Sequence, residues 1–171
     1  MKLFAPDLVK WLSAAFLDGQ ISAGTAHIRG NLQDFPFTQD NGEFSIEAKL
    51  NNVDFHFAPD WPLMNKVNGK LAFSGDRIII DVANTDIMGI PIDNVHGLIE
   101  NLSGSKPSIL SVATNVVHSD FQKGFALVHA SPLEKTVGKM FKKAQLYGDI
   151  TLKLGLTVPL AQAENTTVSG D

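Results

Sequence analysis

The residues that could do acid–base or metal chemistry are spread thinly along this sequence. Asp54 and His56 would lie on one face of a strand and could begin a metal site, but the simpler interpretation is that both face solvent. Asp81 and Asp86 offer two carboxylates for acid–base catalysis, yet they flank a predicted hairpin, where charged side chains commonly point to water. We therefore expect no metal site and no catalytic residues.

Motifs for nucleophilic catalysis and nucleotide binding are also missing. No serine lies in a Gly-x-Ser-x-Gly elbow, and neither glycine-rich phosphate motif occurs. Ser131 is better explained as a helix cap. Cysteine is absent, which excludes disulfides, thiolate metal sites and a cysteine nucleophile. The sequence thus predicts a protein that is not an enzyme and needs no cofactor.

Composition and charge narrow the class of protein further. Apolar residues make up 44% of the 171 residues and charged residues 19%, as in a globular domain, and the length favours a single domain, 1–171. The net charge is -4, and lysines cluster only at 139–143, so a nucleic-acid partner is not expected. No apolar run is long enough to cross a bilayer, and no signal-peptide core precedes Pro6. The abrupt start suggests a piece of a longer chain whose membrane anchor lies elsewhere.

Two segments have helical patterns. Residues 1–18 place Trp11, Leu12 and Ala15 on one face, and Asp18-Gly19 would end the helix. Residues 131–144 begin with a Ser-x-x-Glu capping box and end in lysines, which favours a capping helix. Residues 162–171 are polar and are predicted to be a flexible tail.

Most of the remaining sequence alternates between apolar and polar residues, as strands with one dry face do. The apolar positions run from Phe44 to Leu50, and after Asn51-Asn52 the parity changes for Val53–Phe57, which indicates a bulge. The row Ile150–Leu160 predicts a single strand extending roughly 35 Å at about 3.3 Å per residue. Short links at 74–76 and 88–91 favour antiparallel pairing.

Two segments combine aromatic residues with proline, Asp34–Phe37 and Ala58–Leu63. Their rings could close the ends of an ordinary core. They could also form a rigid apolar lip at the edge of a groove, because aromatic side chains bury large areas. The sequence leaves both interpretations open.

An ordered series of short landmarks runs through nearly the whole chain. The series comprises the Trp11-Leu12 helix, Gln20–Leu32, Asp34–Phe37, Gly42–Phe44, Ala58–Leu63, Gly69–Gly75, Ser131–Leu133 and the Leu-x-Leu-x-Leu strand that ends at Pro159-Leu160. In this order they resemble the AsmA-like proteins, specifically the YhdP-type branch of large bacterial envelope proteins. The resemblance implies a long periplasmic β structure anchored in the inner membrane, with an apolar channel for phospholipid between the two membranes.

We therefore predict a mainly β fold with two short helices, in which an antiparallel, strongly curved sheet forms a groove or half-open barrel. It would be one slice of the longer periplasmic structure, with adjoining segments of the same chain and a phospholipid or other acyl-chain lipid as partners. An isolated fragment would tend to oligomerise through its exposed apolar surface. The candidate lipid-contacting residues are Phe44, Ile46, Leu50, Val53, Phe55, Phe57, Leu71, Phe73, Ile150, Leu152, Leu154, Leu156 and Val158.

Two other functions remain open at this stage. A closed β-sandwich serving as a scaffold or protein-interaction module of the envelope would use the same apolar rows to pack its two sheets together. A hydrolase of envelope polymers would need Asp54, Asp81 or Asp93 to meet in one cleft.

Overall fold

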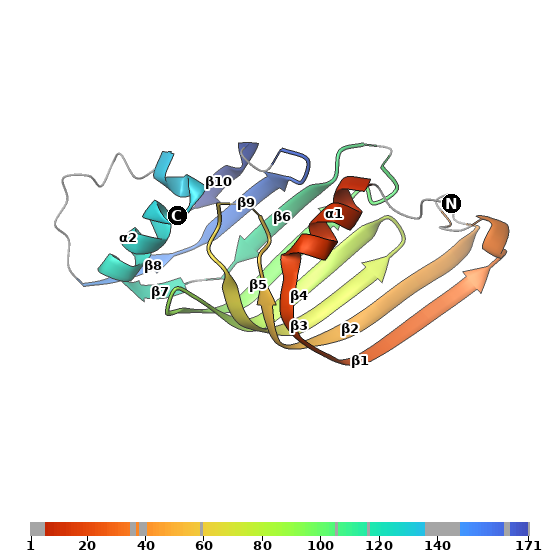
Figure 1. The fold of residues 1–171 in the computed structure, drawn as a ribbon, viewed down its shortest axis with the longest axis horizontal. Helices are drawn as coiled ribbons and strands as arrows, with labels where there is room; N and C mark the ends of the chain where they lie inside the picture. The colour runs from red at the N-terminus through yellow and green to blue at the C-terminus, as the bar shows by residue number, and fades with distance from the viewer. Residues whose placement is uncertain are drawn as a thin grey trace.

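One large antiparallel sheet dominates the computed structural model, which describes residues 6–34, 37, 41–58, 60–104, 106–115, 117–135, 148–162 and 165–170 (Figure 1). In this part of the chain its eight strands follow the order β1-β2-β3-β4-β5-β6-β9-β10. Their bounds are β1 Phe16–Gly30, β2 Gly42–Phe55, β3 Met64–Ser74, β4 Arg77–Ile87, β5 Ile90–Glu100, β6 Ile109–Thr114, β9 Leu154–Pro159 and β10 Thr167–Gly170. The predicted fold class, mainly β with an open antiparallel sheet, is confirmed.

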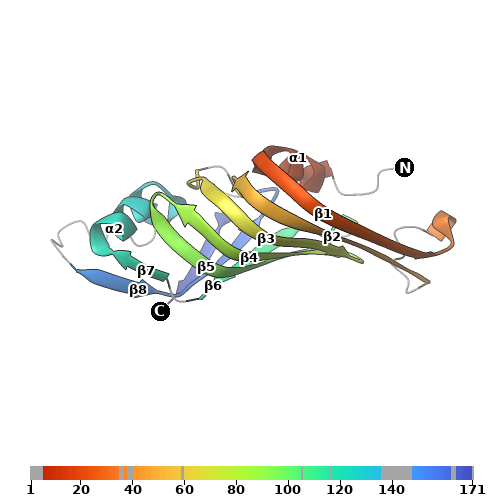
Figure 2. The same ribbon diagram turned by 90° about the horizontal axis from the view of Figure 1, so that it is seen from below.

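A smaller unit is inserted between β6 and β9. It contains strand β7 (Val117–Asp120), helix α2 (Phe121–His129), the 3-10 helix η2 (Pro132–Lys135) and strand β8 (Asp149–Leu152). Among the described strands, β7 and β8 pair with each other and with no other strand. Helix α1 (Pro6–Ala15) precedes β1, and the 3-10 helix η1 (Leu32–Asp34) follows it. Figure 2 shows the curved strands with α1 and α2 on the same side of the sheet.

The tight links between strands follow their sequence signals. Gly75 has φ +58° in the two-residue turn between β3 and β4, and Gly89 has φ +77° between β4 and β5. Left-handed backbone favours glycine at both positions. These links place β3, β4 and β5 side by side in antiparallel pairing, as the sequence predicts.

The predicted bulge at the two asparagines is present and belongs to a longer irregularity. Asn52 has φ +48°, and the pairing of β2 with β3 shifts between Leu50 and Val53. The pairing of β3 with β4 shifts next to it, between Asn65 and Asn68, and the Asn68 amide oxygen accepts a hydrogen bond from the Asn52 N–H at 3.0 Å. Because bulges bend strands and increase their twist, irregularities on neighbouring strands favour a curved sheet.

The long strand predicted for Ile150–Leu160 is wrong. The chain leaves the strand conformation at Lys153, so β8 lies in the small sheet and β9 in the large one. The Thr114 hydroxyl accepts from the Leu154 N–H at 3.0 Å, at the point where β9 joins β6. Apolar and polar residues keep alternating across the break because each of the two strands has its own apolar face. The alternation alone therefore does not distinguish two short strands from one long strand.

Helix predictions are only partly matched. Helix α1 ends at Ala15, earlier than the predicted residue 18, because the Ala15 carbonyl accepts from the His56 N–H and the chain continues as β1. Strand β1 itself was missed, since bulges at Phe16–Ala23 interrupt its alternation. Helix α2 was also missed, although Asp120 caps it by accepting from the Gln122 and Lys123 N–H groups.

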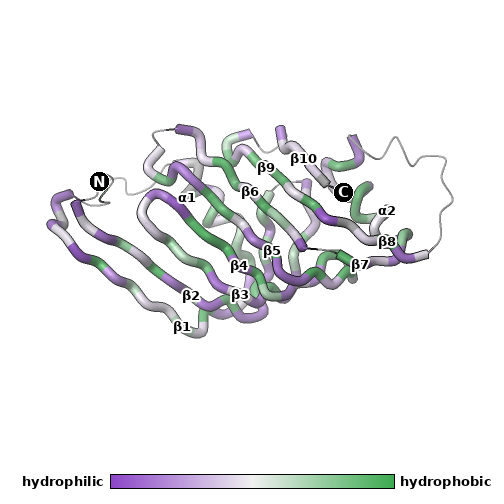
Figure 3. Tube along the Cα trace, turned by 180° about the vertical axis from the view of Figure 1, so that it is seen from behind, coloured by the Kyte–Doolittle hydropathy of each residue, from purple (hydrophilic) through white to green (hydrophobic). Residues whose placement is uncertain are grey.

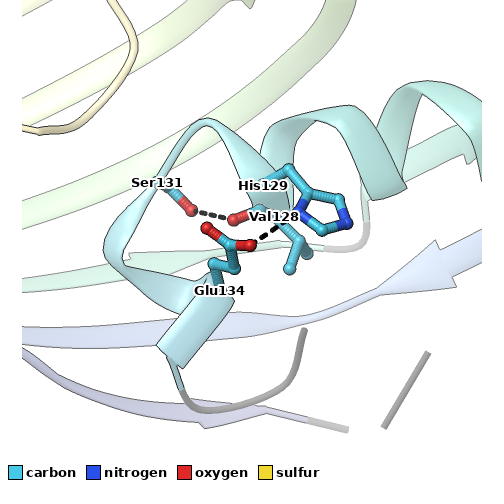
Figure 4. Close-up of polar contacts among 4 residues, drawn as sticks. All are labelled: Val128, His129, Ser131 and Glu134. Atoms are coloured by element: carbon cyan, nitrogen blue, oxygen red, sulfur yellow. Dashed lines mark hydrogen bonds and ion pairs between the residues drawn. The ribbon is translucent and has the colours of Figure 1, made fainter. Parts of the chain in front are cut away.

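The capping box predicted at Ser131 does not form. Figure 4 shows the Ser131 hydroxyl donating to the Val128 carbonyl at 3.1 Å, while the Glu134 carboxylate pairs with His129 at 3.0 Å. Both side chains therefore hold the end of α2 against η2. Residues 136–144 of the predicted helix lie outside the described part of the chain.

The end of the chain also differs from the prediction. Residues 167–170 of the expected flexible tail form β10 and pair with β9, where Val168 lies opposite Leu156. Within the described residues, none of the helices combines the length and the apolar character that a bilayer crossing requires.

Gly69 permits the close approach of β3 and β4, which makes it a test of the register. An alanine Cβ there would lie 2.2 Å from the Asp81 carbonyl oxygen and 2.9 Å from Val82 Cα, both backbone atoms. Gly69→Ala should therefore lower the free energy of unfolding by about 1–3 kcal/mol, measured by urea denaturation.

Gly24→Ala in β1 is the matched control. Its new Cβ would lie 3.5 Å from the Glu47 carbonyl oxygen, an ordinary contact, so stability should change by less than about 0.5 kcal/mol. Equal stabilities for the two variants would contradict the register described for β3 and β4.

Candidate functional site

The face of the large sheet that carries α1, here called the inner face, is built from apolar rows that cross the strands. One row runs in register over six strands, through Ile46, Phe73, Ile78, Ile99, Leu110 and Val158. The next contains Ala48, Leu71, Ile80, Gly97, Val112 and Leu156. Figure 3 shows the alternation of apolar and polar residues that produces these rows. The inner face is therefore one continuous apolar surface.

Exposure divides this surface into a covered part and an open part. In the first row Ile78 and Ile99 are 0% exposed, whereas Ile46 and Phe73 are only half-buried. On β1, which pairs with β2 at the edge, Ile28 is 50% exposed and Ile21 is 67% exposed. Their register opposite Phe44 and Leu50 places both on the inner face. The apolar surface is thus open toward β1 and covered over the middle strands.

Helix α1 and the connection between β2 and β3 cover one end of the inner face. The Trp11 indole N–H donates to the Phe57 carbonyl, and the Trp11 ring meets Phe55 edge-on at a centroid distance of 5.8 Å. The His56 ring nitrogen and the Trp61 carbonyl lie 2.8 Å apart, which holds the connection in a compact loop. Both elements are thereby fixed to the sheet and to each other.

A cavity of about 80 Å³ lies between the sheet and its cover. Its wall combines inner-face residues of β4, β5, β6 and β9 with the β2–β3 connection, α2 and η2. The residues are Phe55, Phe57, Trp61, Pro62, Met64, Ile80, Val82, Ile87, Ile92, Val95, Gly97, Leu110, Val112, Thr114, Leu127, Leu133, Leu154 and Leu156. No charged side chain is among them, so the cavity favours an uncharged, apolar occupant.

The opposite face of the sheet mixes polar side chains with apolar ones such as Ile79, Leu98 and Ile109, and it includes a polar row. Lys49, Lys70, Asp81 and His96 follow one another across four strands, and the His96 ring nitrogen lies 2.6 Å from the Asp81 carboxylate. All four are exposed. Charged side chains in this row are confined to the outer face, as expected for a sheet with one wet side.

The carboxylates considered for catalysis have separate surroundings. Asp54 accepts from the Lys66 N–H at 3.2 Å, Asp81 pairs with His96, and Asp93 lies opposite Asn84 in the ladder. His56, the proposed companion of Asp54 in a metal site, lies instead beside the Trp61 carbonyl. Within the described residues, no group of three or more histidine, aspartate or glutamate side chains is arranged to hold a metal ion.

The structure brings most of the predicted lipid-contacting residues to the inner face. Leu50, Val53 and Leu71 are buried there, Phe55, Phe57, Leu154 and Leu156 line the cavity, Val158 is fully buried, and Phe44, Ile46 and Phe73 form the more open part. Ile150 lies elsewhere: it is in β8, and its side chain fills the space beside Gly124 of α2. The side chain of Leu152 lies outside the described part of the chain.

Sequence reasoning missed several residues of the inner face. Ile78, Ile80 and Val82 alternate in β4, and Leu110 and Val112 alternate in β6, so their spacing was an available signal. Ile21 and Ile28 carried a weaker signal, because a register shift between Ile21 and Ala23 separates them. The aromatic segments fall in different places: Phe37 is buried over Gly42, and Trp61 joins the cavity wall. Phe35, Pro36 and Pro59 lie outside the described residues.

Comparison with known proteins gives a match over the full chain. The model of the family described as "YhdP protein" matches residues 1–171. The chain is 28% identical over 169 residues to the Intermembrane phospholipid transporter YhdP of Escherichia coli (strain K12). The match covers 99% of this chain but 13% of the E. coli protein. No solved structure matches the chain.

The division into covered and open parts can be tested with two isoleucines of the same row. Ile99→Ala should lower the free energy of unfolding by about 2–5 kcal/mol, because it leaves a cavity in a fully buried site. Ile46→Ala should cost clearly less, about 1 kcal/mol, because Ile46 is only partly buried and water can occupy the vacated space. Urea denaturation of both variants gives the comparison, and equal losses would contradict an open side toward β1.

Proposed function

This chain belongs to the YhdP family of AsmA-like proteins, and we propose that the inner face of its sheet binds phospholipid acyl chains and conducts them between the inner and outer membranes. The observation that carries the proposal is the apolar row that crosses six strands in register and is open toward β1. The E. coli relative is named an intermembrane phospholipid transporter, which points to the same class of ligand.

The dimensions of the inner face suit an acyl chain. Neighbouring strands lie about 4.8 Å apart, so a row across six strands extends roughly 24 Å. The hydrocarbon region of one leaflet is roughly 15 Å thick, half of the bilayer core. Ile46 and Phe73 are the partly exposed members of this row, whereas Ile78, Ile99, Leu110 and Val158 are covered, so a chain lying on the row would contact its open end on β2 and β3. Each methylene group removed from water contributes about 0.8 kcal/mol, which is enough to hold a chain without any polar contact.

The open side explains how such a surface can carry an amphipathic molecule. A tail lying on Phe44, Ile46 and Phe73 would leave its headgroup beyond the rim of the sheet, in water. Apolar contacts have no direction, so neighbouring positions along a row bind about equally well. A lipid can then move along the surface without crossing a large barrier.

We also propose that the sheet continues into adjoining segments of a longer chain in the periplasm, anchored in the inner membrane by a part outside these residues. Within the described residues, β1 and β10 are edge strands of the large sheet, each with one side unpaired in the ladder. Such edges readily pair with another strand. The chain corresponds to 13% of the E. coli relative. In a protein of that length, the segments before and after these residues would supply the neighbouring strands. In isolation the same edges would promote oligomers, which size-exclusion chromatography would detect.

A scaffold or protein-interaction role is the second candidate, and the long exposed edge of β1 favours it. All of its fifteen residues but Phe16 are exposed. A partner protein could add a strand there by β-augmentation. This role needs no lipid on the inner face, which distinguishes it from the first proposal.

Photocrosslinking tests the lipid-binding proposal at neighbouring residues of opposite faces. A photoreactive amino acid at Ile46 or Leu156 on the inner face should crosslink to phospholipid, because both positions contact the proposed path. The same amino acid at Glu47 or Thr157, one residue further along each strand, should not. Mass spectrometry of the gently purified protein should also recover phospholipid.

Two results would contradict lipid binding at this face. One is equal crosslinking on both faces, which would indicate nonspecific association. The other is the absence of crosslinks together with the recovery of no phospholipid, which would favour the interaction module.

A further inference from the structure

A polar hollow of about 580 Å³ lies in the outer face of the sheet, on the side away from the apolar cavity. It crosses β2, β3, β4 and β5 and reaches the residue that follows β6. Its volume is within the roughly 300–1,000 Å³ that is typical of small-molecule sites. Its polar lining consists of lysines, asparagines, one aspartate and one histidine: Lys49, Asn51, Asn68, Lys70, Asp81, Asn94, His96 and Asn115.

Two lysines of this hollow face each other without a counter-ion. Lys49 lies directly opposite Lys70 in the ladder of β2 and β3, a position where the Cβ atoms are about 4.5–5.5 Å apart. Like charges in such a pair destabilise a sheet. Neither ammonium group forms an ion pair within the described residues. An anion bound between the two lysines would remove their repulsion.

The carboxylate beside the lysines is engaged by a histidine. Asp81 lies opposite both Lys70 and His96 in the ladders of β4. Its carboxylate oxygen lies 2.6 Å from the His96 Nδ1 atom, and it forms no ion pair with Lys70. The two ammonium charges exceed the one carboxylate charge, so the hollow is locally positive in a chain whose net charge is -4. A local positive charge of this kind favours an anionic ligand.

Asparagine amides extend the lining on both sides of the lysines. The side chains of Asn51, Asn94 and Asn115 form no hydrogen bond within the described part of the chain, whereas the Asn68 amide is held by its neighbours through both of its ends. Each amide offers two donors and an acceptor, and a hydroxyl group likewise both donates and accepts. Three such amides beside a positive centre suit a ligand that carries several hydroxyl groups and one negative group.

We propose that this hollow binds an anionic saccharide, with a carboxylate or phosphate of the sugar between Lys49 and Lys70 and its hydroxyl groups on the amides of Asn51, Asn94 and Asn115. The site goes beyond the proposed function, because it lies on the face that carries no acyl chain. The described lining residues include no aromatic ring, so charge and hydrogen bonds, not stacking, hold the sugar. Its affinity should therefore fall as the salt concentration rises.

Other anionic partners fit this hollow less well. Recognition of an anionic lipid surface typically uses a cluster of about four to eight lysines and arginines, and the hollow contains two. A nucleic acid requires a longer positive stripe along its phosphates. A single sugar unit needs only one charged contact region and a set of short polar side chains around it.

Three sugars that share one ring test the proposal. N-acetylglucosamine is neutral, N-acetylmuramic acid adds a carboxylate, and N-acetylglucosamine 6-phosphate adds a phosphate. Calorimetry should show at least one anionic sugar binding about tenfold more tightly than the neutral one, and the tighter of the two identifies the anionic group. In ¹H–¹⁵N NMR spectra the same sugar should shift the side-chain amide signals of Asn51, Asn94 and Asn115. Inorganic phosphate should bind more weakly than either anionic sugar that binds.

Substitution of the lysines gives an independent result. Lys49→Gln or Lys70→Gln should weaken binding of the anionic sugar about three- to tenfold, the value of one hydrogen bond, and leave binding of the neutral sugar unchanged. Without ligand, both variants should be at least as stable as the original chain, because the repulsion between the lysines is removed. Lys106→Gln is the control, since Lys106 is an exposed lysine between β5 and β6 outside the hollow, and it should leave binding unchanged.

The outcomes keep this site separate from lipid binding on the inner face. Equal binding of the neutral and anionic sugars, or binding of none of them, would overturn the site and leave acyl-chain binding in place. Inorganic phosphate binding as tightly as the anionic sugars would reduce the site to an adventitious ion only and overturn the saccharide. Prior addition of dioctanoyl-phosphatidylcholine should not change the affinity for the sugar, and competition between the two would overturn the assignment to the outer face.

Discussion

The cross-strand register of the large sheet is the constraint on which the other features depend. Side chains alternate between faces with a period of two, so a slip of one residue in any strand would turn its apolar set toward water. The pairing of Ile78 with Ile99, and of Ile99 with Leu110, keeps three strands in phase through fully or almost fully buried contacts. The bulges at Asn52 and Lys66 change phase on neighbouring strands, so the inner face remains apolar on both sides of the bend.

Different parts of the inner face stabilise the fold and remain open to solvent. The middle strands are covered by the β2–β3 connection and the α2–η2 unit, while α1 packs against that connection and Phe55 of β2, and the inner residues beneath form the buried core. On β1, among the residues that the structure describes, the inner-face side chains of Ile21 and Ile28 are exposed. An apolar surface that were open throughout would leave little buried area to stabilise the fold. The covered part therefore allows the open part to exist.

Sequence patterns correctly predicted those structural elements that depend on interactions between residues close in sequence. The row Phe44–Leu50, the phase change at the asparagines and the turn at Gly75 each depend on residues close in sequence. The break at Lys153 could not be predicted in this way, because it depends on Thr114, forty residues away. Alternation gave no sign of it, since β8 and β9 each continue the pattern.

The candidate site shows the same division. The sequence predicted the apolar positions of β2, β3 and β9 as a binding surface, but it could not show which of them are covered. Trp61 looked like a core ring or a groove lip, and both descriptions rest on its apolar area. The lack of a hydrogen-bond partner for its N–H among the described residues could be found only from the positions of the surrounding carbonyl groups. Whether a polar group has a hydrogen-bond partner depends on residues that folding brings close to it. A single segment of sequence does not contain those residues.

The central claim is that the inner face, and not the sheet in general, is the surface for acyl chains. The most direct measurement is methyl NMR of isoleucine-labelled protein with a phosphatidylcholine that carries a nitroxide near the end of one tail. Ile28 on the inner face and Ile109 on the outer face are 50% and 38% exposed, so they compare the two faces at similar exposure. We predict strong broadening of the Ile28 and Ile46 methyl signals, with those of Ile109 and Ile79 preserved. Equal broadening on both faces, or none on either, would contradict the account.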